Sequence, residues 1–123
     1  MPESGVTSVE HLPAAVVVHV LSRNLGKSEV DGLCSGTDES RLTAPSLPFI
    51  LDMANVGFAG SLALGVLVGL HKEFRNRGQR LIFVSLQANL RDAFKITHMN
   101  QILEIMQDVP TALRSVEIAA NAT

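Results

Sequence analysis

Three short apolar segments most constrain how this chain of 123 residues can fold. They span residues 14–21, 49–53 and 80–85, and they are rich in valine, isoleucine, leucine and phenylalanine. Short apolar runs of this kind are typical of strands that are covered on both faces. Helix-length segments separate them, and strands that alternate with helices form parallel sheets with right-handed crossovers. We therefore expect an α/β fold with a mainly parallel sheet.

The other predicted elements complete this alternation. A short edge strand over residues 6–12 and the strand after Pro13 are expected to pair antiparallel, because a tight turn joins them. Gly78 stands where a C-terminal glycine cap belongs. Helices are predicted over residues 28–41, 61–77, 89–98 and from Pro110 onward, and a last strand over 103–106. The predicted order is β-β-α-β-α-β-α-β-α, a single domain of residues 1–123 with four to five strands and about four helices.

The residue pattern also predicts how one helix starts and which residues of two helices face the core. Ser28 with Asp31 three residues later resembles a capping box at the start of the 28–41 helix. The expected inner stripe of that helix is Val30, Leu33, Cys34 and Thr37. The expected inner face of the last helix is Leu113, Val116 and Ile118.

Composition and charge exclude several classes of protein. The chain has 10 basic and 12 acidic side chains, one cysteine, no tryptophan and no tyrosine. Nucleic-acid binding is disfavoured, because no basic block tracks phosphates and few aromatic rings can stack on bases. A disulfide framework is excluded. The longest weakly polar stretch, residues 58–70, is too short for a membrane span. The first residues lack the pattern of a signal peptide, so we expect a cytoplasmic protein.

The segment from Asp52 to Gly65 is the best candidate for function. It connects a predicted strand to a predicted helix at the carboxyl end of a parallel strand, where open α/β sheets usually place functional groups. Ser61 is expected at or near the helix N-cap, where the helix dipole favours anions. The serine suits a phosphoryl group, and it equally suits a purely structural cap.

Enzymatic readings of this segment are weak. Ser61 lacks the glycine two residues later that a nucleophile elbow requires. His71 lies ten residues along the same helix, roughly 15 Å away, and cannot serve as its base. Cys34 has no basic neighbours to lower its pKa. The four histidines show no metal-ligand spacing, and the glycines form neither a P-loop nor a dinucleotide fingerprint. We expect no metal, no cofactor and no catalytic residue.

Residues 49–105 resemble the central signature of the STAS family, and most closely the single-domain bacterial anti-sigma factor antagonists. The resemblance extends over approximately residues 7–118. The matching positions are Leu51-Asp52, Phe58, Ser61, Leu64-Gly65, Gly78 and the strand over residues 80–85. The sequence departs from the family pattern at Gly60, which replaces an aspartate, at Leu62, which replaces a second serine, and at Ala63, which replaces a glycine.

The resemblance implies a regulatory binding module rather than an enzyme. By position, Ser61 is the expected phospho-acceptor for a GHKL-type serine kinase that also serves as the anti-sigma factor, and phosphorylation releases the antagonist until a phosphatase resets it. The expected neighbours of the site are Asp52, Asn55 and Gly60, and the expected partner-binding residues are Leu62, Leu64 and Gly65. The departures leave an alternative open: an unswitched STAS adaptor, as in stressosome-like or transporter-associated assemblies.

Overall fold

The computed structural model describes residues 7–121, and side chains through residue 119. Its strands are β1 (Thr7–His11), β2 (Val16–Val20), β3 (Asn24–Leu25), β4 (Phe49–Asp52), β5 (Phe58–Ala59), β6 (Leu81–Val84) and β7 (Glu104–Met106). Its helices are α1 (Lys27–Thr43), α2 (Ser61–Asn76), α3 (Ala88–Ile96), the short 3-10 helix η1 (Met99–Gln101) and α4 (Val109–Asn121). Val6 of the predicted first strand lies outside the described residues.

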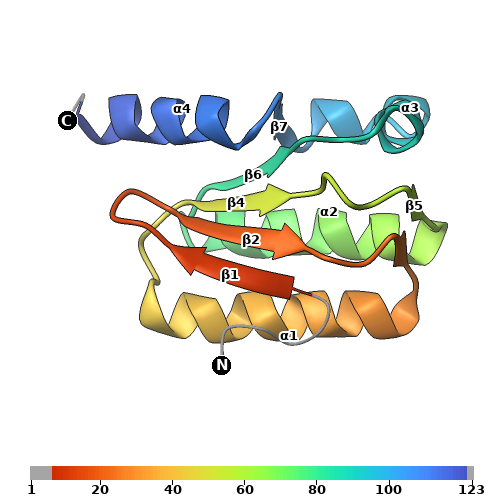
Figure 1. Cartoon of the computed structure of the whole chain (residues 1–123), viewed down its shortest axis with the longest axis horizontal. Helices are drawn as coiled ribbons and strands as arrows, with labels where there is room; N and C mark the ends of the chain where they lie inside the picture. Colours follow the sequence, from red (N-terminus) through yellow and green to blue (C-terminus); the bar gives the residue numbers. More distant parts are fainter. Residues whose placement is uncertain (1–6, 122–123) are drawn as a thin grey trace.

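Five strands form one sheet in the order β1-β2-β4-β6-β7 (Figure 1). β1 pairs antiparallel with β2, and every other pair is parallel. The register aligns Val18, Leu51, Phe83 and Ile105 in one row across the four parallel strands. These findings confirm the predicted fold class, including the antiparallel first pair.

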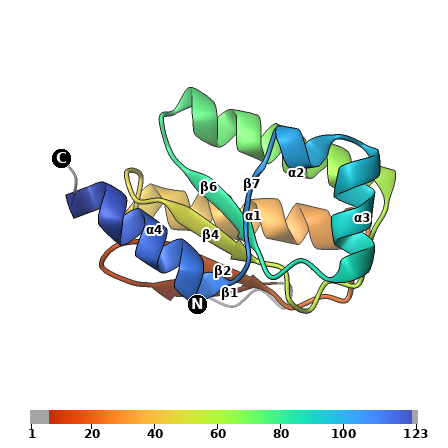
Figure 2. The ribbon, with the colours of Figure 1, turned by 90° about the horizontal axis from the view of Figure 1, so that it is seen from above.

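Helices cover both faces of the sheet, and Figure 2 shows α2 and α4 on opposite sides. The strand residues therefore alternate between two hydrophobic cores, as period-2 geometry requires. The larger core, on the side of α1, α2 and α3, includes Val18, Leu33, Leu51, Leu67, Phe83 and Phe94. The smaller core, on the side of α4, includes Val17, Ile50, Ile82, Ala112 and Val116. Burial on both faces explains why the central strands are apolar throughout.

Helix α2 is held by a stripe of buried side chains and by a tightly bonded C-terminus. The buried residues recur every three or four positions: Ala63, Leu64, Leu67, Leu70 and Phe74. Gly78 has a φ of 67°, in the left-handed region that favours glycine. The N–H of Gly78 donates to the carbonyl of Arg75 at 3.0 Å, and that of Gln79 to Phe74 at 2.8 Å. This pattern is a Schellman motif, so the predicted glycine cap is confirmed.

A buried polar cluster joins the C-terminal ends of α1 and α2. The guanidinium carbon of Arg41 lies 4.2 Å above the ring of Phe74, and its Nε donates to Oε1 of Gln79 at 3.1 Å. The amide of Gln79 donates to the carbonyls of Ala44 at 3.1 Å and Leu47 at 2.7 Å. Arg41 and Gln79 are 6% and 5% exposed. The glutamine therefore satisfies backbone groups just after α1 that would otherwise be buried without partners.

The structure corrects several predicted boundaries. α1 begins at Lys27, one residue before the predicted start, and its N-cap is Gly26. Glu29 caps it, because its Oε1 accepts the N–H of Gly26 at 2.9 Å, so the predicted roles of Ser28 and Asp31 are wrong. The inner stripe of α1 is confirmed, with Val30, Leu33 and Thr37 buried and Cys34 partly buried.

Two further corrections concern the C-terminal half. α3 ends at Ile96, because the backbone of His98 turns into the left-handed region with a φ of 61°. In α4, Ile118 is 67% exposed, and Ala112 takes the inner position beside Val116. The predicted inner face of the last helix is wrong at Ile118, because a residue two positions after Val116 lies on the opposite side of the helix.

Candidate functional site

Ser61 is the first residue of α2 and is exposed to solvent. The N-cap is Gly60, with a φ of −74° and a ψ of 175°, and no side chain caps this end of the helix. Within residues 7–121, the hydroxyl of Ser61 forms no hydrogen bond with another side chain or with the backbone. The serine is therefore near the N-cap, as predicted, but it does not act as the cap.

A two-stranded parallel ladder between β3 and β5 positions the start of α2. Asn24 pairs with Phe58, and Leu25 pairs with Ala59. The carbonyl of Arg23 accepts the N–H groups of Gly57 at 2.8 Å and Phe58 at 3.2 Å. Sequence analysis missed this ladder, because strands of two residues are too short to show periodicity.

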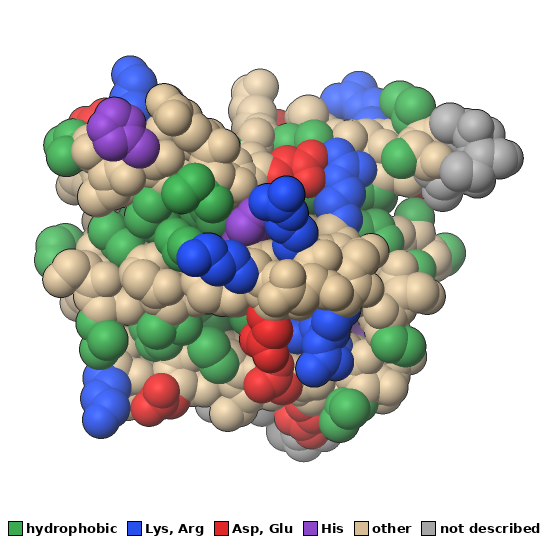
Figure 3. Space-filling model, turned by 180° about the vertical axis from the view of Figure 1, so that it is seen from behind, with side chains coloured by type: hydrophobic (Ala, Val, Ile, Leu, Met, Phe, Trp, Pro, Cys, Tyr) green, Lys and Arg blue, Asp and Glu red, His purple; other side chains and the backbone are tan. Residues whose placement is uncertain are grey.

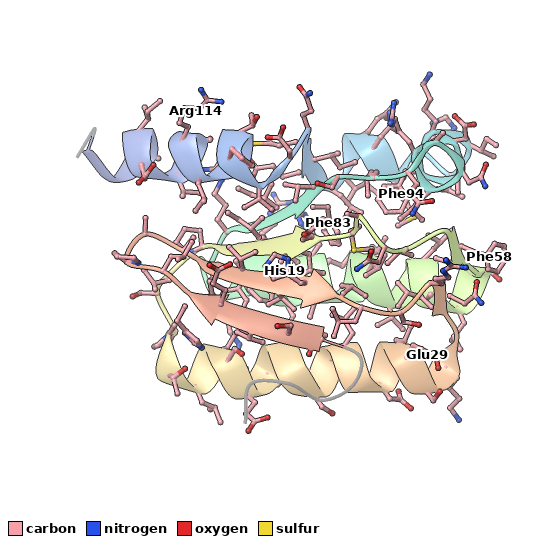
Figure 4. The ribbon with its side chains drawn as sticks, in the orientation of Figure 1. His19, Glu29, Phe58, Phe83, Phe94 and Arg114 are labelled. Atoms are coloured by element: carbon pink, nitrogen blue, oxygen red, sulfur yellow. The ribbon has the colours of Figure 1, made fainter. Side chains whose placement is uncertain are left out.

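The first turn of α2 borders a shallow depression of about 560 Å³. Its lining residues come from the β3 region, from β5 and from α2: Asn24, Leu25, Gly26, Phe58, Gly60, Ser61, Leu62 and Ala63. Phe58 and Leu62 are 64% and 60% exposed, although both are large apolar side chains. Figure 4 shows Phe58 at the end of the molecule, beside β5. An exposed apolar pair beside a depression is typical of a contact surface.

The three predicted partner-binding residues differ in their exposure. Leu62 is exposed, and a Cβ added at Gly65 would meet no atom within 4 Å, so both face open space. Leu64 is 9% exposed and belongs to the larger core. We leave Leu64 out of the contact surface, because its side chain faces the sheet.

Of the three predicted neighbours of Ser61, Gly60 lines the same depression as the serine, and Asp52 and Asn55 do not. Asp52 lies at the end of β4, where its Oδ2 is 2.7 Å from Nδ1 of His19 and its Oδ1 accepts the N–H of Ala54 at 3.1 Å. Asn55 is exposed in the turn that follows. In Figure 4, His19 lies over the middle of the five-stranded sheet, and Phe58, in β5, lies at the right-hand end of the molecule.

His19 is the centre of a charged row on the sheet that sequence analysis did not predict. Its Nε2 lies 3.3 Å from Oε1 of Glu10, and its other ring nitrogen contacts Asp52. Burial alone would lower the pKa of His19, but the hydrogen bonds and charges of Asp52 and Glu10 outweigh it and raise the pKa above its ordinary value. Because the two carboxylates lie on β1 and β4, the strands on either side of β2, only the sheet register could have revealed this row.

Other candidates for chemistry lack the required environment. Burial, followed by the nearby charges of Asp38, Asp31 and Glu73, raises the pKa of the Cys34 thiol, so the thiol is not activated. Across residues 7–121, no three histidine, cysteine or acidic side chains gather as a metal site would require. The same part of the chain contains no helix that is long and apolar enough to span a membrane.

The fold and the site together define a small α/β domain with an open contact surface at the start of one helix. The STAS domain family model matches residues 14–112. The chain belongs to the STAS family.

The curated proteins similar to this chain include anti-sigma-B factor antagonists. The anti-sigma-B factor antagonist of Listeria monocytogenes is 36% identical over 55 residues, which cover 45% of this chain and 48% of that protein. The chain thus spans about half the length of the curated relatives it matches.

Solved structures of the same type show the fold. A STAS domain protein from Planctomyces limnophilus, described as an anti-sigma-factor antagonist, superposes with a TM-score of 0.79 at 19% identity, over 90% of this chain and 97% of that one. The anti-sigma factor antagonist SpoIIAA in its unphosphorylated form gives a TM-score of 0.68 at 17% identity, over 90% and 97% of the two chains.

Proposed function

We propose that this STAS domain is an anti-sigma factor antagonist that acts in the cytoplasm without catalysing a reaction. Its partner is an anti-sigma factor that is also a GHKL-type serine kinase. The unmodified domain binds this partner, phosphorylation of Ser61 ends the binding, and a phosphatase restores it. The observation that carries the proposal is the exposed hydroxyl of Ser61 at the start of α2, which is committed to no hydrogen bond within residues 7–121.

The position of Ser61 allows a phosphoryl group without unfolding the domain. A phosphoserine carries a charge of about −1.5 to −2 at pH 7. The first turn of α2 has no acidic side chain, so the positive end of the helix dipole stabilises the added charge. Phosphorylation therefore changes the surface and leaves the core intact.

The same charge disfavours a partner that covers the site. A partner packed against Phe58 and Leu62 would enclose the phosphoryl group and remove its water. Burying an unpaired anion costs several kcal/mol. Release of the partner follows from this desolvation penalty.

A second function, an unswitched adaptor, is favoured by two departures from the family pattern. Gly60 leaves the acceptor without the neighbouring carboxylate of the family pattern, and Leu62 replaces a second serine with an apolar group. An adaptor would use the same contact surface permanently. It predicts that no phosphate is found on Ser61 and that a negative charge there leaves complex formation unchanged.

Two measurements test the proposal. Mass spectrometry of the protein from its native cells, across growth and stress conditions, is expected to show an increment of about 80 Da on Ser61 in a condition-dependent manner. Binding to the purified anti-sigma factor is expected to weaken at least ~10-fold in Ser61→Asp, a loss of about 1.4 kcal/mol, and to stay unchanged in Ser61→Ala.

Ser35 provides the matched control, because it is also an exposed helical serine but lies on α1. Ser35→Asp is expected to bind like the unmodified chain. Equal binding by Ser61→Asp and Ser61→Ala, together with unmodified Ser61 under every condition, would establish the adaptor instead.

A further inference from the structure

We infer that His19 is a positioning residue for the contact surface at Phe58, Ser61 and Leu62, because it holds the place where the chain leaves the sheet toward that surface. This inference rests on the proposed function, since it concerns the geometry of the same surface. It is carried by the register of the strands and by a series of hydrogen bonds. The imidazole exchanges protons near neutral pH, so the surface it positions responds to pH.

Strands β2 and β4 separate beyond His19 and Asp52 and pair again close to Ser61. His19 and Asp52 form the last register pair of these two strands. The next pair of the two chains is Asn24 with Phe58, in the short ladder of β3 and β5. The chain advances five positions from His19 to Asn24 and six positions from Asp52 to Phe58. The connecting segment after β4, residues 53–57, therefore contains one extra residue, which its turn has to accommodate.

Asp52 links the imidazole of His19 to this turn. Its Oδ2 lies 2.7 Å from Nδ1 of His19, and its Oδ1 accepts the N–H of Ala54 at 3.1 Å. The carbonyl of Ala54 in turn accepts Nε2 of Gln87, the N-cap residue of α3, at 2.8 Å. The side chain of Asp52 is only 17% exposed, so these two bonds fix its orientation with little competition from water.

The far end of the connecting segment carries the contact surface. The N–H groups of Gly57 and Phe58 donate to the carbonyl of Arg23 at 2.8 Å and 3.2 Å, and Ser61 follows three residues after Phe58. In Figure 3, hydrophobic side chains lie along the left edge, where α1 and α2 begin. The segment is short and bonded at both ends, so a change at Asp52 is transmitted to Phe58 and Ser61.

The protonation state of His19 sets how firmly Asp52 is held. The imidazolium ring has two N–H donors and serves Asp52 at 2.7 Å and Glu10 at 3.3 Å at the same time. The neutral ring has one donor and no charge, so one carboxylate loses its hydrogen bond and the other keeps a weaker one. The hold on Asp52 therefore weakens as the pH rises and His19 loses its proton.

The charges that act on His19 come from the strands on either side of it. Burial lowers the pKa of His19, and the hydrogen bonds and charges of Asp52 and Glu10 outweigh this effect and raise it. His19 faces the side of the sheet that α4 covers, because Val17, two positions earlier, belongs to the smaller core. The other titratable or charged residues of β1 and around α4 are not among the groups that shift this pKa: His11, Asp108, Arg114 and Glu117.

The first experiment follows the isotope-labelled full chain by NMR between about pH 5 and pH 9. The imidazole resonances of His19 and the amides of residues 53–61 are recorded at each pH. The amides of residues 58–61 are expected to shift with the same midpoint as the imidazole, and this midpoint should lie above about 6.5. Amides of residues 58–61 that do not follow the imidazole would overturn the inference.

Two carboxylate variants separate positioning from a change in charge alone. Asp52→Asn and Glu10→Gln each remove one carboxylate from the imidazole, so both should lower the midpoint of the His19 titration. Only Asp52 is bonded to the turn. Asp52→Asn should therefore reduce the amplitude of the Ser61 amide response at least about 2-fold, whereas Glu10→Gln should preserve it. Equal reductions in the two variants would contradict a positioning role.

A histidine control identifies the group that titrates. His19→Gln is expected to abolish the response of the Ser61 amide. His71→Gln is expected to preserve it, although His71 lies on the same helix as Ser61. A response that survives in His19→Gln and disappears in His71→Gln would assign the effect to α2 itself and overturn the inference.

Hydrogen exchange separates local positioning from a loss of global stability. At about pH 6, His19→Gln is expected to accelerate exchange of the amides of Gly57 and Phe58 about 5-fold relative to those of Gly78 and Gln79. The second pair also donates to backbone carbonyls, at 3.0 Å and 2.8 Å, but lies at the opposite end of α2. Uniform acceleration of all four amides would show that His19 only stabilises the fold.

These measurements use the chain without a partner, so they fail independently of the proposed function. An unmodified Ser61 in cells, with unchanged partner binding in Ser61→Asp, would remove the proposed switch but not the pH response of the amides. Amides of residues 58–61 that ignore His19 would remove its positioning role but not the phosphorylation of Ser61.

Discussion

The two ends of helix α2 differ in how their polar groups are satisfied. The C-terminal end has a Schellman motif at Gly78 and leads into the buried cluster of Arg41 and Gln79. The N-terminal end has a glycine N-cap, no capping side chain, and two exposed apolar groups at Phe58 and Leu62. Most polar groups at the C-terminal end are bonded internally, although Nη2 of Arg41 is buried without a hydrogen-bond partner among the described residues. The N-terminal end keeps its donors and apolar surface for solvent or a partner.

The C-terminal end of α2 therefore contributes mainly to stability, and the N-terminal end is available for contact with a partner. Groups that are already bonded internally contribute to the free energy of unfolding but offer nothing to a partner. Groups that are left open add little to stability and can be changed by a modification without unfolding the domain. We therefore expect substitutions at the two ends of α2 to affect different measurements.

The largest effect on stability is expected for Gln79→Ala. The substitution leaves the carbonyls of Ala44 and Leu47 and the Nε of Arg41 without their partner in a buried place. The free energy of unfolding should fall by roughly 3 kcal/mol, measured by urea denaturation with circular dichroism.

Gln87 offers a control near the other end of the helix, because it is exposed and donates one hydrogen bond to the carbonyl of Ala54. Gln87→Ala should cost less than about 1 kcal/mol. Equal losses at the two glutamines would remove the contrast between the ends of α2.

His19→Gln, a substitution in strand β2 of the sheet, should lower the free energy of unfolding by a smaller, pH-dependent amount. The pKa of His19 is raised in the folded state, so its protonated form stabilises the fold. This contribution is fully present below the unfolded pKa of about 6.5. It is lost as the pH rises through the higher folded pKa.

Urea denaturation across this pH range should show the effect. The stability difference between the unmodified chain and His19→Gln is expected to reach ~1 kcal/mol at most on the acidic side and to shrink on the alkaline side. A difference that grew with pH would contradict the ion pairs with Asp52 and Glu10.

The smallest effect on stability is expected for Gly60→Asp. Unlike the preceding substitutions, it should raise the free energy of unfolding. The φ of Gly60 is open to any residue, and a Cβ there would meet only ordinary contact with Phe58. An aspartate N-cap should raise the free energy of unfolding by about 0.5 kcal/mol, seen as a higher midpoint in urea. Gly60→Asn separates capping from charge: both variants should be stabilised, and the aspartate should gain the larger increment from the helix dipole.

The fold was predictable where the sequence carries a periodic apolar signal. The central strands followed from their apolar runs, and the glycine cap at the end of α2 followed from the needs of the backbone. The site was harder, because Asp52 meets His19, which is 33 residues away along the chain, and only the sheet register brings the two together. Residue type alone did not distinguish Leu62 from Leu64, because both are leucines in the first turns of the same helix. The helical geometry exposes Leu62 to solvent and places Leu64 in the core.

The short ladder between β3 and β5 has a consequence for anyone who wishes to copy or block this surface. It joins two stretches that lie more than thirty residues apart, so the epitope is discontinuous. A linear fragment taken from either stretch would lack half of the contacts and the geometry that orients them. Mimics of this domain must therefore reproduce the folded scaffold that holds the two stretches together.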